Sequence, residues 1–399
     1  MTASPGGSPP LAAVYGVPLP EVDVVEVPVE VAERFAAAHH RLRPESVGVH
    51  LGDGEVRVTA TAAVAADAEA VVDDVVARIR DAGRPIVVAG PEVVRRDAVD
   101  GLHALAVALS AGVLNTWGAK GVFDWRSRHH LATVGLQAWD LDRGGLADAD
   151  LIVTTGLDAA ELPEPLTSDG WRGIPVVDIA PGALVSLAAR VARPEVEIPF
   201  PPLRDRLAQV TRAGWARDGA PLAPTRVTQA YGSLVEAGGV VAADPGVAGF
   251  WVARTLPTTA LRSVVVPADP DEAGAAIATA VVARLLDPSR PALAVVDELG
   301  EPGRLGLEAA ARLGVPVAVE RWSPDGDLVD AAAHAERLAR IVADGGTVSL
   351  ATDPTQLDDV VAVAGPVTAW RSRTGSEEGR TSRGSRPGDR WGHSVAPPT

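Results

Sequence analysis

RPIVVAG, at residues 84–90, is the stretch that decides the fold class. A short β-branched run that stops at Gly90-Pro91 is typical of a strand buried on both faces of a parallel sheet. Before it, residues 63–81 repeat apolar side chains with helical spacing, and after it residues 97–111 form the next predicted helix. Helices that alternate with buried strands predict a parallel α/β sheet.

The same alternation continues along the chain. In the first half we predict further strands at 113–117, 151–155 and 174–179, with a glycine-rich turn at 118–121. The second half is predicted to hold helices at 225–237, 271–286, 303–313, 330–343 and 354–363 and strands at 239–243, 291–296, 315–319 and 347–351. The predicted fold class is therefore α/β, with two three-layer domains that each contain a parallel sheet.

Composition shifts set the predicted domain boundaries. We divide the chain into an N-terminal segment at 1–59, a central domain at 60–200, a linker at 201–224, a second domain at 225–370 and a tail at 371–399. The linker is rich in proline and contains one short predicted helix. The start of the N-terminal segment and the whole tail are rich in Gly, Pro and Ser, so we expect them to be disordered.

Bulk properties exclude several functions. The chain has 399 residues, a formal charge of −16 and no cysteine. The negative charge argues against nucleic-acid binding, and the missing thiols exclude disulfides and Cys-ligated zinc. No apolar run approaches the length that crosses a bilayer, and the N-terminus has no signal-peptide pattern. We therefore expect a cytoplasmic protein that binds neither nucleic acid nor membrane.

Ordered phrases in the first half resemble the central domain of the thiamine-diphosphate enzymes of the acetolactate synthase and 2-oxo acid decarboxylase type. The phrases are RPIVVAG (84–90), LNTWGAKGVF (114–123), HHLATVGLQ (129–137), GLADADLIVTTG (145–156) and IPVVDIAPG (174–182). The third phrase is similar to a loop in that family. The resemblance implies a nucleotide-binding-like central domain.

The second half resembles the pyrophosphate-binding domain of the same enzymes. GGVVAADPGVAGFWVAR (238–254) is similar to the strand that ends in Asp-x-Gly and runs into a Trp-bearing helix. Residues 271–298 are similar to the helix and strand that lead to the family's Gly-Asp-Gly motif, and residues 336–370 to its closing helix, strand and helix.

The sequence departs from the family at the residues that would bind the divalent metal. The family holds its cofactor through a divalent metal bound by Gly-Asp-Gly and a downstream Asn, and magnesium requires oxygen ligands in near-octahedral geometry. Here the motif reads Val296-Asp297-Glu298, and the downstream segment ERWSPDGD (320–327) has no Asn. Asp297 is the one candidate metal ligand. We expect thiamine diphosphate and magnesium not to bind tightly.

The N-terminal segment also departs from the family. PESVGVHLGDGEVRVT (44–59) resembles only the end of a pyrimidine-binding domain, whose Glu activates the cofactor. Glu26, Glu30 and Glu33 have no motif context that ties them to that role. We predict no catalytic residue, and we expect a homodimer or a complex with a separate pyrimidine-domain protein; a fold-back of residues 11–60 is the alternative.

Candidate cofactor-binding residues lie where predicted parallel strands end, because ligands of open α/β sheets bind at that edge. They are Gly90, Gly118, Lys120, Gly156, Asp178, Asp244 and Gly246. In the central domain the resemblance implies an FAD or an ADP-type nucleotide. The alternatives are plain turn residues for the glycines, a helix cap for Asp178, a solvated surface side chain for Lys120, and a turn requirement for Asp244 and Gly246.

His129 and His130 share a predicted loop with Arg126 and Arg128. Adjacent histidines do not make a metal site by themselves, so a loop role or an anion contact is what they indicate. Two functions remain open. One is a catalytically degenerate homologue that serves as a binding, structural or regulatory protein. The other is a thiamine-diphosphate-dependent lyase or transferase of a 2-oxo acid that needs a separate pyrimidine-domain subunit.

Overall fold

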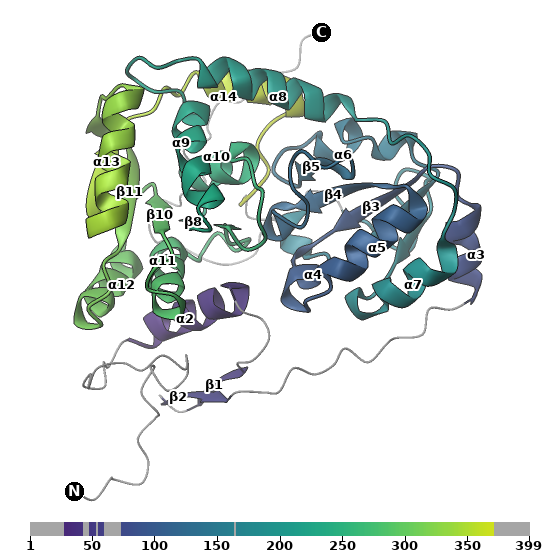
Figure 1. Cartoon of the computed structure of the whole chain (residues 1–399), viewed down its shortest axis with the longest axis horizontal. Helices are drawn as coiled ribbons and strands as arrows, with labels where there is room; N and C mark the ends of the chain where they lie inside the picture. Colours follow the sequence, from purple (N-terminus) through teal and green to yellow (C-terminus); the bar gives the residue numbers. More distant parts are fainter. Residues whose placement is uncertain (1–27, 43–47, 53–54, 60–72, 163–164, 371–399) are drawn as a thin grey trace, which may run out of the picture.

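The computed structural model describes residues 28–42, 48–52, 55–59, 73–162 and 165–370 (Figure 1). The tail, the first residues of the chain and the predicted start of the helix at 63–81 lie outside the described residues.

The first sheet has five parallel strands in the order β5-β4-β3-β6-β7. The strands are β3 (Pro85–Ala89), β4 (Gly112–Thr116), β5 (His130–Val134), β6 (Leu151–Thr155) and β7 (Val176–Asp178). The strand order reverses between β3 and β6, which creates the crevice where open α/β sheets bind ligands.

Helices cover both faces of this sheet. One face packs against α3 (Asp73–Asp81), α4 (Pro91–Arg95), α5 (Val99–Leu109) and α7 (Leu184–Val191), and the opposite face holds α6 (Asp140–Arg143). Apolar side chains from the strands alternate between two separate core clusters, one on each side. RPIVVAG forms the central strand β3, and three of its side chains, Val87, Val88 and Ala89, have 0% exposure.

The second sheet is also parallel, in the order β12-β11-β10-β8-β9. Its strands are β8 (Val240–Ala243), β9 (Val264–Val265), β10 (Ala292–Val296), β11 (Ala318–Asp327) and β12 (Gly346–Leu350). Its helices are α9 (Pro224–Glu236), α10 (Val247–Thr255), α11 (Ala275–Leu286), α12 (Glu301–Arg312), α13 (Ala331–Asp344) and α14 (Gln356–Ala364). The prediction of two parallel α/β sheets, each with helices on both faces, is confirmed.

Several elements differ from the sequence-based expectation. The loop expected at the two histidines contains strand β5, because His130 begins a buried run that pairs with β4. The short helix predicted in the linker is α8 (Pro202–Trp215), and its Leu207 and Val210 pack against both cores. Helix α7 was not predicted.

Helix α2 (Val29–Leu42) was also not predicted, and it packs on α11 and α12 (Figure 1). Val31, Phe35, Ala38 and Leu42 recur at helical spacing and are all at most 3% exposed. Arg34 Nε donates to the Ala273 carbonyl at 2.6 Å. The part of the N-terminal segment that forms α2 therefore folds onto the second α/β unit. Strands β1 (Gly48–Gly52) and β2 (Glu55–Thr59) form an antiparallel pair.

The two units are joined by a buried ion pair between Asp140 of α6 and Arg254 of α10. Both side chains have 0% exposure, and Arg254 Nη2 lies 2.8 and 2.6 Å from the two carboxylate oxygens. The same carboxylate accepts the amides of Leu136 and Gln137. Gln137 Nε2 in turn donates to the carbonyls of Val360 and Gly365. One turn of the central unit is therefore hydrogen-bonded to the C-terminal end of the second unit.

We predict that Asp140→Ala lowers the free energy of unfolding by about 3–5 kcal/mol, because it leaves the Arg254 guanidinium buried without a counter-charge. Urea denaturation would measure the change. Asp142→Ala is the matched control, because it removes a partly exposed carboxylate from the same helix and its ion pair with Arg172 contributes no more than about 1 kcal/mol. Equal effects of the two variants would contradict the prediction.

Candidate functional site

Two carboxylates meet at the carboxyl edge of the second sheet. Asp244 follows β8 and Asp297 follows β10, and these two strands are neighbours at the point where the strand order reverses. The structure therefore brings together the predicted candidates Asp244, Gly246 and Asp297.

Asp297 caps the N-terminus of α10. Its carboxylate oxygens accept the amide of Val247 at 2.7 Å and the amide of Ala248 at 3.0 Å. Gly246 allows this approach, because its φ is +142° and a Cβ at that position would collide with Asp297 Oδ2. The amides that would otherwise attract an anion at this helix end are satisfied by a carboxylate of the chain itself.

Asp244 does the same for the next helix. Its two oxygens accept the amides of Gly274 and Ala276, both at 2.8 Å, at the start of α11. The pKa of Asp244 is raised to about 6, and burial is the main cause. The hydrogen bonds from the two amides lower the pKa, whereas the negative charge of Asp297 raises it. These contacts fit one of the two alternatives for Asp244, namely that the turn between the strand and the helix requires its side chain.

The residues at this edge do not fit a magnesium diphosphate. All four oxygens of Asp244 and Asp297 accept backbone amides. The downstream segment is part of β11, and its buried Glu320 accepts hydrogen bonds from Tyr231, Trp322 and His334. No group of three His, Cys, Asp or Glu side chains placed to hold a metal occurs among the described residues. We therefore derive no catalytic step through a metal or a diphosphate.

Backbone packs closely where β3 and β6 of the first sheet end. Gly90 follows β3 and Gly156 follows β6, and a Cβ on Gly90 would collide with the Gly156 carbonyl. That carbonyl accepts the amide of Glu92, so the two glycines fit the start of α4 against the end of β6. Asp178 lies apart from them at the exposed end of β7, where Thr154 Oγ1 donates to it at 2.7 Å.

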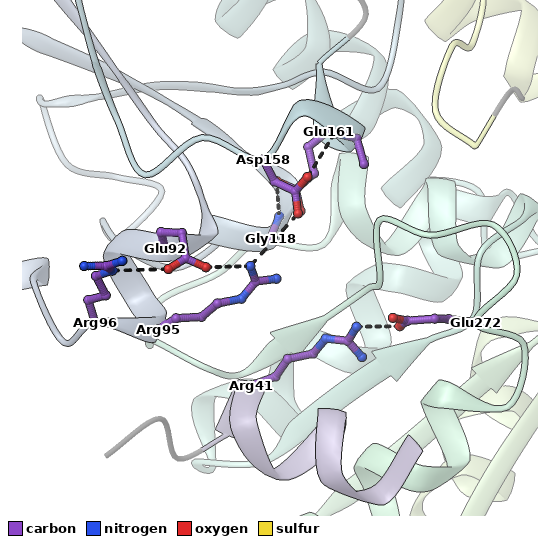
Figure 2. Close-up of polar contacts among 9 residues, drawn as sticks. Arg41, Glu92, Arg95, Arg96, Gly118, Asp158, Glu161 and Glu272 are labelled. Carbon is purple, nitrogen blue, oxygen red and sulfur yellow. Dashed lines mark hydrogen bonds and ion pairs between the residues drawn. The ribbon is translucent and has the colours of Figure 1, made fainter. Parts of the chain in front are cut away.

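A cavity of about 260 Å³ lies between the two units and α2. Figure 2 shows its polar walls: Arg95 pairs with Glu92, Arg41 of α2 pairs with Glu272, and the Gly118 amide donates to Glu161 at 3.3 Å. Lys120 also lines this cavity. Of the seven predicted cofactor-binding residues, Gly118 and Lys120 are the two that line it.

Lys120 is buried, and the solvated surface alternative is wrong. Lys120 is only 9% exposed. Burial, together with the positive charge of Arg254, lowers the pKa of Lys120 to about 7. Glu161 is buried in the same region, and burial raises its pKa to about 7. Within the described ranges no ion pair joins these two residues.

The two histidines do not act together. His129 Nδ1 lies 2.9 Å from the carbonyl of Ala111, a contact that fixes the start of β5. Burial and the charges of Lys120 and Arg204 lower the pKa of His130 to about 3, so its imidazole is neutral at pH 7.

Residues 72–182 match the family model described as thiamine pyrophosphate enzyme, central domain. The likeness to that family is limited to this region, which is less than a third of the chain. A solved structure from Mycobacterium smegmatis, of a protein assigned as a thiamin diphosphate-dependent enzyme, shares 18% sequence identity with the chain at a TM-score of 0.54. The match covers 70% of this chain and 63% of that one, and at this identity it shows a shared fold. Nowhere in the described ranges is a helix long and apolar enough to cross a membrane.

In the region that this family model matches, Glu161 was missed by the sequence analysis. It lies in the segment LDAAELPEP after β6, and no spacing in that segment signals that a glutamate turns inward. Arg41 was missed because α2 was missed. The sign that could have revealed Arg41 is the helical spacing of Val31, Phe35 and Ala38, since α2 brings Arg41 to the cavity.

We predict a pH-dependent difference in stability between the wild type and Asp244→Asn. The folded pKa of Asp244, about 6, exceeds the unfolded value of 3.8, so the folded state binds the proton more tightly. As the pH falls from 7 to 5, the free energy of unfolding of the wild type should therefore rise by about 1 kcal/mol relative to the variant. Urea denaturation at each pH tests this, and a constant difference over that range would contradict it.

Proposed function

We propose that this thiamine-diphosphate enzyme-like protein is catalytically degenerate and serves as a binding or regulatory protein that works without magnesium and thiamine diphosphate. The observation that carries the proposal is the contact of Asp297 with the amides of Val247 and Ala248. A helix N-terminus with free amides attracts a phosphate, and here a fixed carboxylate takes that position.

The electrostatics support the same conclusion. A diphosphate at the start of α10 would lie beside the carboxylates of Asp297 and Asp244, and like charges at this distance disfavour each other. If Asp297 turned away to hold a metal, the start of α10 would lose its cap. The second ligand that the family takes from downstream has no counterpart, because Glu320 is fully buried in its own hydrogen bonds.

The central unit has a cavity at the edge of its sheet where β3, β4 and β6 end, next to the close contact of Gly90 with Gly156. An FAD or ADP-type ligand would use this cavity, where Lys120 offers a cation to a phosphate. The central unit is therefore proposed as a ligand-binding unit whose site faces the second unit.

Calorimetric titration with thiamine diphosphate and magnesium at millimolar concentration tests the loss of the cofactor. We expect no saturable heat for the wild type. Asp297→Ala frees the amides of Val247 and Ala248, so we expect this variant to bind inorganic pyrophosphate more tightly than the wild type does.

Asp325→Ala, which removes an exposed carboxylate from the same domain, is the matched control and should behave as the wild type. Saturable micromolar binding of thiamine diphosphate to the wild type would overturn the proposal. Binding that appears only after a pyrimidine-domain protein is added would favour the alternative, a thiamine-diphosphate-dependent lyase or transferase with two kinds of subunit.

Assembly is a separate proposal. We expect a homodimer or a complex with a pyrimidine-domain protein, and helix α2 already covers the face formed by α11 and α12. Light scattering at micromolar concentration should give about twice the chain mass of 41.0 kDa for the homodimer. A monomer mass, with no pyrimidine-domain protein recovered from the native cell, would contradict the expectation.

A further inference from the structure

A second cavity, of about 390 Å³, lies between helix α8, the edge strand β5 and the end of α10. It is separate from the carboxylates at the edge of the second sheet. Volumes of this order accommodate small organic molecules. Its apolar walls come from three different elements of the chain. They are Trp125, Leu131, Ala132, Leu207, Ala208, Trp215, Leu256 and Pro257.

The charged residues of this cavity are mostly cations, in a chain whose net charge is −16. Lys120, Arg204, Arg212 and Arg254 line it, and Asp205, which is exposed, is the one carboxylate among the described lining residues. A local excess of positive charge inside an acidic protein attracts anions.

The four cations are not equivalent. Arg254 is neutralised by Asp140, as described above. Arg204 donates to the carbonyls of Trp125, Ser127 and His130, which are uncharged acceptors, and the carboxylate of Asp205 is the counter-charge that acts on it. Arg212 is exposed.

Lys120 is the cation that most needs a partner. It has 9% exposure and lines both cavities, yet its ammonium has no hydrogen bond or ion pair with any residue that the structure describes. Arg254 is the charged group that acts on the Lys120 ammonium, and it repels the ammonium. The neighbouring His130 is neutral. A buried ammonium without a counter-charge is costly, and a bound anion would remove that cost.

The walls are also short of hydrogen-bond acceptors. Arg254 Nε and Trp215 Nε1 lack an acceptor among the described residues, and His130 Nδ1 also has no hydrogen-bond partner there. Indole rings beside a cation suit a ligand that has an apolar or aromatic body and one acidic end.

We propose that this cavity, between α8 and β5, binds a small organic monocarboxylate. The carboxylate would pair with Lys120, and the apolar body would lie against Trp125, Leu207 and Trp215. The proposal does not depend on the loss of thiamine diphosphate, because none of these residues belongs to the edge at Asp244 and Asp297.

Calorimetric titration of the full chain with phenylacetate, at a pH below 7 where Lys120 is charged, tests the proposal. Phenylacetamide is the matched ligand, because it has the same shape without the charge. We expect saturable binding of phenylacetate and at least tenfold weaker binding of phenylacetamide. Lys120→Met should weaken phenylacetate by roughly 10- to 100-fold, the usual range for one charged hydrogen bond. Arg206→Met removes an exposed cation from helix α8 that does not line the cavity, and it should leave the affinity unchanged.

Two further variants locate the ligand. Ala208→Trp fills the cavity and should abolish binding, whereas Ala160→Trp narrows the first cavity and should leave it intact. A thermal melt of each variant confirms that it folds. Equal affinities for phenylacetate and phenylacetamide, no saturable binding of phenylacetate, or loss of binding in Ala160→Trp but not in Ala208→Trp would each overturn the proposal.

Discussion

The buried ion pair between Asp140 and Arg254 is the contact on which the arrangement of the two sheets depends. Two charges removed from water are tolerated only where each is paired and its remaining hydrogen-bonding capacity is used, and both conditions hold here. The carboxylate also accepts two amides of the central unit, and Arg254 Nη1 donates to the Thr133 carbonyl of β5. The pair therefore sets the distance between β5 and α10, and with it the width of the cavity between them.

At the edge of the second sheet, carboxylates of the chain itself satisfy the amides at two helix starts. A helix that starts at the carboxyl end of a strand presents free amides, and some acceptor must satisfy them. In a diphosphate-binding protein the ligand can do so. Here Asp297 and Asp244 accept the amides of α10 and α11. These contacts stabilise the starts of the two helices.

Periodicity in the sequence was sufficient for the two sheets. RPIVVAG and the strand at 151–155 have the bounds predicted for them, because a buried parallel strand is a short β-branched run with sharp ends. The contacts that decide the sites were not predictable in that way. The burial of Lys120 depends on α8 and α10, and the capping role of Asp297 depends on a turn 50 residues away in the chain. Such contacts join elements through tertiary packing, which local patterns do not encode. Helix α2 was missed for a different reason: its apolar spacing is regular, but the sequence around it is rich in Val and Glu, which obscures a helical pattern.

Lys120 links the two cavities with the junction between the units. It lies after β4 in a phrase that resembles the thiamine-diphosphate enzymes, but its neighbours Arg254 and His130 come from α10 and β5. An ammonium held in this position disfavours the ligand-free state, because burial and a nearby guanidinium both oppose its charge. A ligand that supplies the missing negative charge would contact β5, α8 and α10 at the same time. Binding of such a ligand would thus strengthen the contact between the two units, and this coupling is the physical basis on which the proposed site could report the presence of a metabolite.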